Sequence, residues 1–326
     1  MARSYVRIVT QIGKETTPGT AVAATKTLAG AMIDFSPELD VKRYRAAGKR
    51  LTTTSVLNKN WVAGKYDGVL SYNELPVFLD GLLGEASPAS VGTGGYGRTY
   101  SLLDVQTATA KTYTLRRGDT TAAQVATQGQ FKSFTMQSDR NEVKMNGTLV
   151  GQAIDNAGSL TSSIPQMTES PVSGNEVSIY VDSTSGALGT TALGCPFNFK
   201  INIPDLFSEK WCLNRANTSF ADTPEIAVEP TISFDIEFSS QARALYDAVV
   251  LSSLPVRFIR FDALGANIGT GADYKIQWDF AAKIRSCKEV PDVDGVYAYT
   301  FEWDVVFNSA WAKAMNVYVV NATATI

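Results

Sequence analysis

The 326-residue chain has no histidine and few cysteines. The absence of histidine excludes Ser-His-Asp and Cys-His nucleophilic systems, together with every histidine-ligated metal site. The three cysteines, Cys195, Cys212 and Cys287, are widely spaced and form no CxxC pair. Such spacing is typical of small buried hydrophobic side chains rather than of disulfides or metal ligands. We therefore expect no cofactor and no metal site.

Long apolar runs and a strong net charge are also lacking. No run approaches the roughly 20 apolar residues of a membrane helix, and no signal peptide is evident in the opening residues MARSYVRIVTQIGKE. The net charge of −3 implies no bulk affinity for nucleic acid or for an anionic membrane. The sequence therefore predicts a globular protein made in the cytosol, without a membrane partner and long enough for two domains.

Two parts of the chain share one order of elements. In each, a strand ends at a proline, a long polar segment follows, and a second strand then runs into a helix. The prolines are Pro37 and Pro204, and the predicted helix caps are Asn73 and Ser240. The two intervals, 73 − 37 and 240 − 204, are both 36 residues. We interpret this as an internal duplication, although two β-rich domains could share the spacing by chance.

The predicted fold is mainly β with short helices. Its parts are an N-terminal arm (1–30), a first unit (31–154), a linker rich in Ser, Thr, Pro and Gly (155–176) and a second unit (177–326). Each unit is expected to contain several strands and the one helix just described.

Asp235 and Glu237 raise the question of catalysis. They lie two residues apart on the polar side of an alternating strand, where a pair of carboxylates could serve a glycosidase. The same alternation recurs around Lys200, around Asp279, and at Glu302 with Asp304. Four strands with this pattern predict a sheet with one dry face and one wet face.

A carbohydrate-binding or hydrolytic β-sandwich is the alternative from another functional class. Clustered exposed tryptophans and a carboxylate pair across a cleft would favour it. Trp278 and Trp303 lie on alternating strands, out of step with the acids, so we expect both of them in the core.

The segment 42–65 contains seven basic residues and no acid, whereas its counterpart 205–230 contains five acids and two basic residues. A basic loop can be merely solvated or can contact nucleic acid. Opposite charges on equivalent loops suggest instead that the loops contact one another, between subunits. The residues expected in such contacts are Arg43, Tyr44, Arg45, Lys49, Arg50 and Trp61 in the first loop, and Trp211, Arg215 and Glu225 in the second.

The stretch GKETTPGTAVAATKTLAGAMIDFSPELD resembles the N-terminal segment of tail tube (major tail) proteins of long-tailed, siphovirus-like bacteriophages. The stretches GVLSYNELPVFLDGLLGE and GQFKSFTMQSDRNEVKMNGTLVGQ strengthen this resemblance. It covers most of the chain, and it is carried by soft patterns rather than by a catalytic signature.

The resemblance implies a structural virion protein rather than an enzyme. Each unit would be a β-sandwich or partial barrel flanked by a helix, and two fused units would form trimeric, pseudo-hexameric rings. The rings would stack into a β-barrel tube around the path of the DNA. Implied partners are further copies, the tape measure, terminator and distal tail proteins, and double-stranded DNA in transit, bound without sequence specificity. A tail-completion (terminator) protein is the alternative within this class.

In this interpretation the wet face lines the bore. Six units of four strands give 24 strands, which at ~4.8 Å spacing and ~40° tilt make a backbone diameter of about 48 Å. Side chains would leave a bore near 38 Å, wider than a DNA duplex. Five acids would face it against Lys200 and Lys275, so that the wall would repel phosphates. These acids are Asp235, Glu237, Asp279, Glu302 and Asp304. The 42–65 segment would pack against a neighbouring ring.

Overall fold

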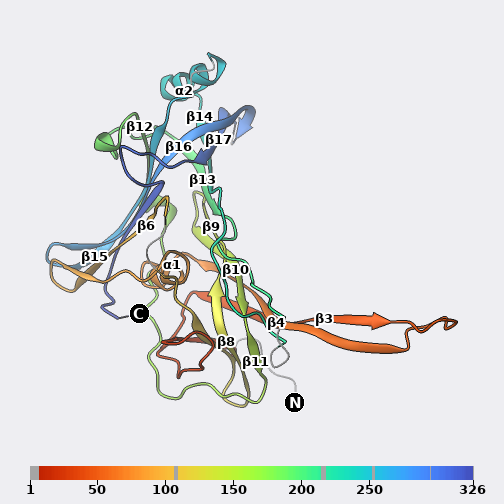
Figure 1. The fold of residues 1–326 in the computed structure, drawn as a ribbon. Helices are drawn as coiled ribbons and strands as arrows, with labels where there is room; N and C mark the ends of the chain where they lie inside the picture. Colours follow the sequence, from red (N-terminus) through yellow and green to blue (C-terminus); the bar gives the residue numbers. More distant parts are fainter. Residues whose placement is uncertain (1–6, 106–108, 214–217, 252–253, 294, 326) are drawn as a thin grey trace.

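The structure, a computed structural model, describes residues 7–105, 109–213, 218–251, 254–293 and 295–325. Within these ranges the chain is mainly β-structure with the short helices α1 and α2, as the sequence predicts. The strands pair antiparallel in one large sheet that does not close. Figure 1 shows the sheet folded over α1, with the hairpin of β3 and β4 projecting from one side.

The strands range in length from two to 22 residues. The first half contains β1 (Val9–Lys14), β2 (Lys26–Thr27), β3 (Ala31–Tyr44), β4 (Thr54–Val69), α1 (Leu75–Leu83), β5 (Ala89–Val91), β6 (Gly95–Leu102), β7 (Tyr113–Gly118), β8 (Ala123–Phe131), β9 (Phe134–Ser138), β10 (Val143–Gly151) and β11 (Ala153–Asp155). The second half contains β12 (Val177–Asp182), β13 (Pro196–Ile203), β14 (Thr231–Glu237), α2 (Ser240–Val250), β15 (Arg257–Gly269), β16 (Ala272–Val293), β17 (Val296–Val305) and β18 (Met315–Asn321).

The part of the sheet that concerns function is a row of strands that we call the wall. Its order is β3, β4, β10, β9, β13, β14, β17 and the C-terminal part of β16. The pairing of β9 with β13, over Phe199–Ile203, joins the two halves of the chain edge to edge. These strands lie side by side and alternate in direction, so the wall has two distinct ends at which strands begin and finish. We call the end from which β3 and β4 project the arm end, and the other the far end.

Strand pairings in the two halves correspond. In the first half, β1 pairs β7, β7 pairs β8, β8 pairs β11, β9 pairs β10, β10 pairs β4 and β4 pairs β3. In the second half, β12 pairs β15, β15 pairs β16, β16 pairs β18 and β17, β17 pairs β14 and β14 pairs β13. The long strand β16 thus occupies the places of both β8 and β9.

Alternation along β13, β14 and β17 produces the two faces of the wall. Phe199, Phe234 and Trp303 are fully buried, and the Phe234 ring lies 5.9 Å from that of Trp303, centroid to centroid. Across the core, Phe199 lies 5.3 Å from Phe261 of β15. Burial of each such side chain contributes roughly 1.5–3 kcal/mol, so this dry face fixes the register of the wall.

The helices follow the predicted strand-to-helix order, with small changes at their caps. All nine residues of α1 are buried, and a Cβ atom on Gly81 would lie 2.5 Å from the Phe131 ring, so the helix needs glycine there. The cap positions are Glu74 and Ser239 rather than the expected Asn73 and Ser240. The Ser239 hydroxyl accepts a hydrogen bond from the Ala242 amide at 3.2 Å.

The N-terminal residues expected as an extended arm contribute strands. β1 pairs with β7 over its whole length and β2 pairs with β1. A short run without clear alternation, such as VTQIGK, becomes a strand only when a partner is present, and that partner lies about a hundred residues along the chain. The segment 155–176 is largely irregular beyond β11, and its residues near Ser170 run along the end of β4.

Candidate assembly surfaces

The wet face of the wall brings four of the five predicted acids together. Asp235 and Glu237 on β14 and Glu302 and Asp304 on β17 lie on adjacent, paired strands and are partly exposed. Asp235 accepts hydrogen bonds from the side chains of Asn198 and Thr300. Glu302 accepts one from Ser286 Oγ at 2.7 Å. The polar cross-strand contacts make this a continuous hydrated surface.

Asp279 lies elsewhere, contrary to the expectation that it faces a bore. It is 4% exposed on the N-terminal part of β16, which pairs with β15 and β18 instead of β17. Arg260 forms a bidentate ion pair with its carboxylate, with N–O distances of 2.6 and 3.0 Å, and Gln277 donates to it at 2.9 Å. The predicted alternation of Asp279 with buried neighbours is correct. The long side chains of Arg260 and Gln277, however, cover the polar face on which Asp279 lies.

Basic residues that sequence reasoning missed share the wet face with the acids. Lys283 lies directly opposite Asp304, Arg285 contacts Asp304 at 3.6 Å, and Lys288 lies opposite Thr300. With Lys200, these equal in number the four acids named above on β14 and β17, since 4 − 4 = 0. The expected surplus of negative charge is therefore not present on this half of the wall. The cross-strand pairing that places Lys283, Arg285 and Lys288 here has no local sequence signal.

The alternative function, that of a carbohydrate-binding or hydrolytic β-sandwich, gains no support from this surface. Trp278 and Trp303 are both 0% exposed, which confirms the prediction that they belong to the core. Asp235 is held by neighbouring polar side chains on its own sheet. Neither tryptophan offers a platform on which a sugar ring could stack beside the acids.

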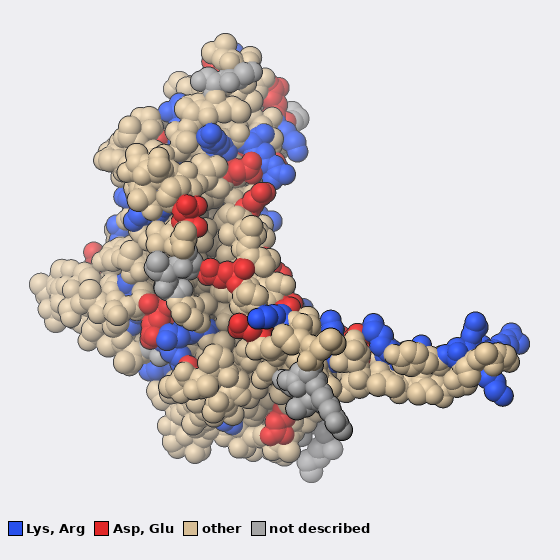
Figure 2. Space-filling model, viewed as in Figure 1, with Lys and Arg blue, Asp and Glu red and all other residues tan. Residues whose placement is uncertain are grey.

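The basic segment forms a two-stranded hairpin, which we call the arm: residues 38–60 of β3, its turn and β4. Beyond Pro37 the two strands pair only with each other among the described residues, and every residue from 42 to 52 is exposed. Figure 2 shows basic residues along this projection, concentrated toward its tip. The basic residues and Tyr44 predicted for a contact thus lie at the tip, away from the body; they are Arg43, Tyr44, Arg45, Lys49 and Arg50.

At its base, the arm contacts the 205–230 segment of the same chain. The rings of Trp61 and Trp211 meet edge to face at 5.6 Å, and Lys59 Nζ lies 4.3 Å from the centre of the Trp211 ring. The Asn60 amide donates to the Thr218 carbonyl at 3.0 Å. The two loops were expected to meet between subunits, whereas the structure shows them in contact within one chain, at the base of the arm.

The 205–230 segment differs from the arm in shape. Its described residues, 205–213 and 218–230, fold back on the body as irregular chain, where Lys132 binds Asp205 at 3.1 Å and Glu209 at 2.9 Å. Its residue Glu225 lines an apolar groove at the arm end of the wall, and burial raises the pKa of this carboxyl. Arg215, also predicted for a contact, lies outside the described residues.

Open strand edges terminate the wall on both sides. In the parts of the chain that are described, β3 pairs with β4 alone, and residues 283–293 of β16 pair with β17 alone. An open edge presents unpaired N–H and C=O groups that can pair with another chain. These edges, the arm and the wet face are the candidate assembly surfaces.

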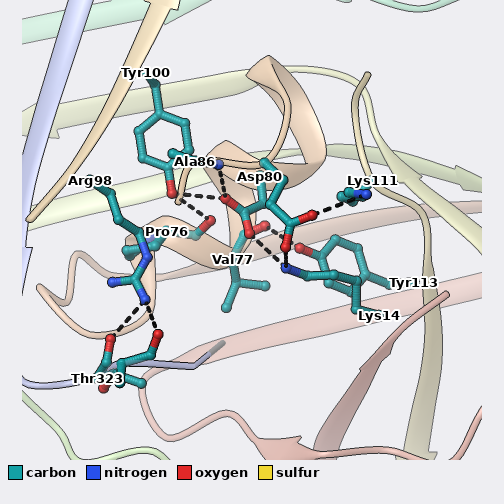
Figure 3. A network of polar contacts seen from close by, with 12 residues as sticks. Lys14, Pro76, Val77, Asp80, Ala86, Arg98, Tyr100, Lys111, Tyr113 and Thr323 are labelled. Atoms are coloured by element: carbon teal, nitrogen blue, oxygen red, sulfur yellow. Dashed lines mark hydrogen bonds and ion pairs between the residues drawn. The ribbon is translucent and has the colours of Figure 1, made fainter. Parts of the chain in front are cut away.

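A buried polar network beneath α1 is the other concentration of charged groups (Figure 3). Asp80 of α1 is 1% exposed and accepts from Lys14 Nζ at 3.0 Å and from the Tyr100 hydroxyl at 2.9 Å. Burial raises the pKa of Asp80, against the opposing effect of Lys14. Arg98, 2% exposed, donates to Asn321 Oδ1 and to carbonyls near the C-terminus. Because Asp80, Tyr100 and Arg98 are buried and find their partners within the chain, we interpret the network as structural.

No protein-family model matches this chain, and no curated protein matches it significantly. The described helices include none that is long and apolar enough to cross a membrane.

Proposed function

We propose that the chain is the subunit of a tube of stacked rings, a structural virion protein of the phage tail tube kind, built from two tandem units. The observation that carries this proposal is the seam between β9 and β13. There, two blocks of four strands meet edge to edge through an antiparallel pairing of five residues. Among the described residues, their outer edges, at β3 and the C-terminal part of β16, pair with no further strand.

The matching pairings of the two halves indicate how another copy would be added. β3 corresponds to β13, and the C-terminal part of β16 corresponds to β9, so the open edges of successive copies are complementary. The seam uses the end of β13 next to Pro204. With Pro37 aligned to Pro204, the corresponding part of β3 is residues 32–36. Within it the Ile33 amide already donates to Thr10 Oγ1 at 3.4 Å, and just before it the Ala31 amide donates to Glu74 at 3.0 Å. A head-to-tail contact of this type generates a ring when its rotation closes.

Three copies supply 3 × 8 = 24 wall strands, the number expected for a barrel whose bore exceeds the width of a DNA duplex. The wet face would line this bore. Its mixture of acids and basic residues presents little net charge, so a passing phosphate backbone would find no continuous patch to bind. In this role the partners are further copies, the other tail proteins named above and DNA in transit.

The test is the mass of the assembled ring together with a cross-link across the proposed seam. Ser36→Cys and Lys283→Cys, in a Cys212→Ser background, place thiols on the wet face near the arm end of each open edge. We expect three copies per ring by native mass spectrometry, and oxidised ladders that end at a trimer. Thr135→Cys with Asn202→Cys, opposite each other in the internal seam, is the positive control and should cross-link within one chain. Six copies per ring, or a protein that stays monomeric when concentrated, would refute the proposal.

A further inference from the structure

We propose that Thr10 and Glu74 guard the outer edge of β3 in the free subunit, and that pairing with a second copy requires the Thr10 hydroxyl to be displaced from this edge. We call these two residues the edge guard. The inference rests on the proposed function and specifies how the lateral contact between copies is regulated.

The outward backbone groups of β3 are few. Successive residues of a strand direct their amides to opposite edges, so alternate amides of β3 point away from β4. The Ala31 and Ile33 amides donate to side chains rather than to β4, which places both of them in the outward set. Phe35 continues this set, and Pro37 interrupts it because proline has no amide hydrogen. From Ala31 to Pro37, the outward donors are therefore the amides of residues 31, 33 and 35.

The edge guard already holds two of these three donors. Thr10 Oγ1 accepts from the Ile33 amide at 3.4 Å, and the Glu74 carboxylate accepts from the Ala31 amide at 3.0 Å. Both guard residues are buried, with exposed fractions of 5% for Thr10 and 0% for Glu74. A strand of a second copy would thus meet an edge on which two donors are occupied by the chain's own side chains.

The two guard residues differ in how firmly they hold the edge. Glu74 accepts from three consecutive amides, those of residues 29–31, and it is also the cap residue of α1. Hydrogen bonds to an ionised acceptor are roughly twice as strong as neutral ones. Thr10 offers a neutral hydroxyl and one bond, at the long end of the usual N–O range. We therefore assign Glu74 as the fixed end of the seam and Thr10 as the exchangeable guard.

The second half of the chain supplies an internal comparison. There, the corresponding edge of β13 pairs with β9 over Phe199–Ile203. The cap residue of α2, Ser239, accepts from Ala242 of its own helix and does not reach across the strand. Within the described residues, the guard thus occurs on the edge that awaits another chain, and it is missing from the edge that the chain pairs by itself.

Such a guard has a physical purpose in a chain with two complementary edges. Unpaired strand edges are sites of uncontrolled association, and proteins commonly cover them. When a second copy pairs at Ile33, its carbonyl replaces the Thr10 hydroxyl as acceptor, so the seam gains less than it would at an unoccupied edge. The competing explanation is that the bond only ties β1, which pairs with β7, to the wall. A tie alone would change stability without changing the concentration at which copies associate.

Removal of the hydroxyl separates the two explanations. Thr10→Val leaves the Ile33 amide without its acceptor in the free subunit, which should favour each seam by about fivefold. Three seams multiply to about 125-fold in the equilibrium constant of a trimer, so the concentration for half-assembly, which varies as its square root, should fall about tenfold. Sedimentation velocity over a dilution series measures this concentration. Thr10→Ser keeps the hydroxyl and should behave as the unmodified protein does.

Thr114→Val is the matched control. Thr114 is also buried, and its hydroxyl accepts from the Val22 amide at 3.0 Å, away from the edge of β3. Its loss should leave the concentration for half-assembly unchanged. If Thr10→Val does not lower this concentration, or if Thr114→Val lowers it equally, the inference is wrong. A failure of the unmodified protein to form rings refutes the proposed function, and the inference with it.

Amide hydrogen exchange tests the guard in the unmodified protein, independently of whether a variant folds. In the dilute subunit, the Ile33 amide should exchange at least about tenfold more slowly than that of Phe35, as NMR would resolve. In assembled rings both amides should be protected. Equal exchange of the two amides in the dilute subunit would overturn the inference, because the Thr10 hydroxyl would then provide no protection.

Discussion

Asp80 gives a quantitative test of how α1 is held beneath the wall. Its buried carboxylate accepts from Lys14 Nζ at 3.0 Å, from the Tyr100 hydroxyl at 2.9 Å and from the Ala86 amide at 3.4 Å. A neutral hydrogen bond contributes about 1 kcal/mol net, and one to a charged donor ~1.5–3 kcal/mol. Asp80→Ala removes all three and leaves the Tyr100 hydroxyl buried. We therefore expect the free energy of unfolding to fall by about 4 kcal/mol.

A set of variants separates charge from hydrogen bonding. Asp80→Asn should cost about half as much, since an amide oxygen can still accept from Tyr100 and Lys14 keeps its contact with Glu85 at 2.8 Å. Asp247→Ala on α2 is the matched control, because its ion pair with Arg243 is exposed and should contribute less than ~0.5 kcal/mol. Urea unfolding followed by tryptophan fluorescence measures all three variants. A loss below about 1 kcal/mol for Asp80→Ala would show that the network does not hold the helix.

Two further predictions concern single groups. Burial raises the pKa of Glu74 above its ordinary value of 4.5, although the amides of residues 29–31 donate to it. The folded carboxyl therefore takes up its proton at higher pH than the unfolded one, so the wild type should gain stability relative to Glu74→Gln as pH falls from 7 toward 4.5. Urea titrations at several pH values check this, and a shift in the opposite direction contradicts it. Cys212 is exposed, whereas burial raises the pKa of Cys287 to about 11. At pH 8 a maleimide should modify Cys212 at least about tenfold faster, as peptide mapping would reveal, and equal rates would contradict the burial of Cys287.

The sequence predicts the local elements well where one face of a strand or helix is dry. The strand before α2 and the helix itself follow from alternation and a serine cap, and the structure moves the cap by one residue, to Ser239. Trp278 and Trp303 are core residues, as their phase relative to the acids predicts. The periodicity of apolar residues reflects the burial pattern of a segment directly. These features can therefore be predicted without knowing which strand is the partner.

Features that depend on distant pairing were not predictable in this way. The arm appears in the sequence as a long polar segment, because a hairpin exposed on both faces has no dry side to impose alternation. Asp279 has the same local pattern as Glu302, and its burial depends on Arg260 of the neighbouring strand β15. Lys283 lies on the wet face because β16 extends beyond the end of its pairing with β15. From there on, β16 pairs with β17 instead.

The internal seam between β9 and β13 has a consequence for the order and concentration dependence of assembly. In a ring of three such chains, half of the six lateral contacts would form during folding, at the effective concentration set by the connecting residues 139–195. Only the other three would carry the loss of translational and rotational freedom on association. Fewer species would lie between monomer and closed ring, so partial rings would be scarce during growth. Fusion also makes the two blocks inequivalent, which allows one to extend an arm while the other keeps its loop against the body.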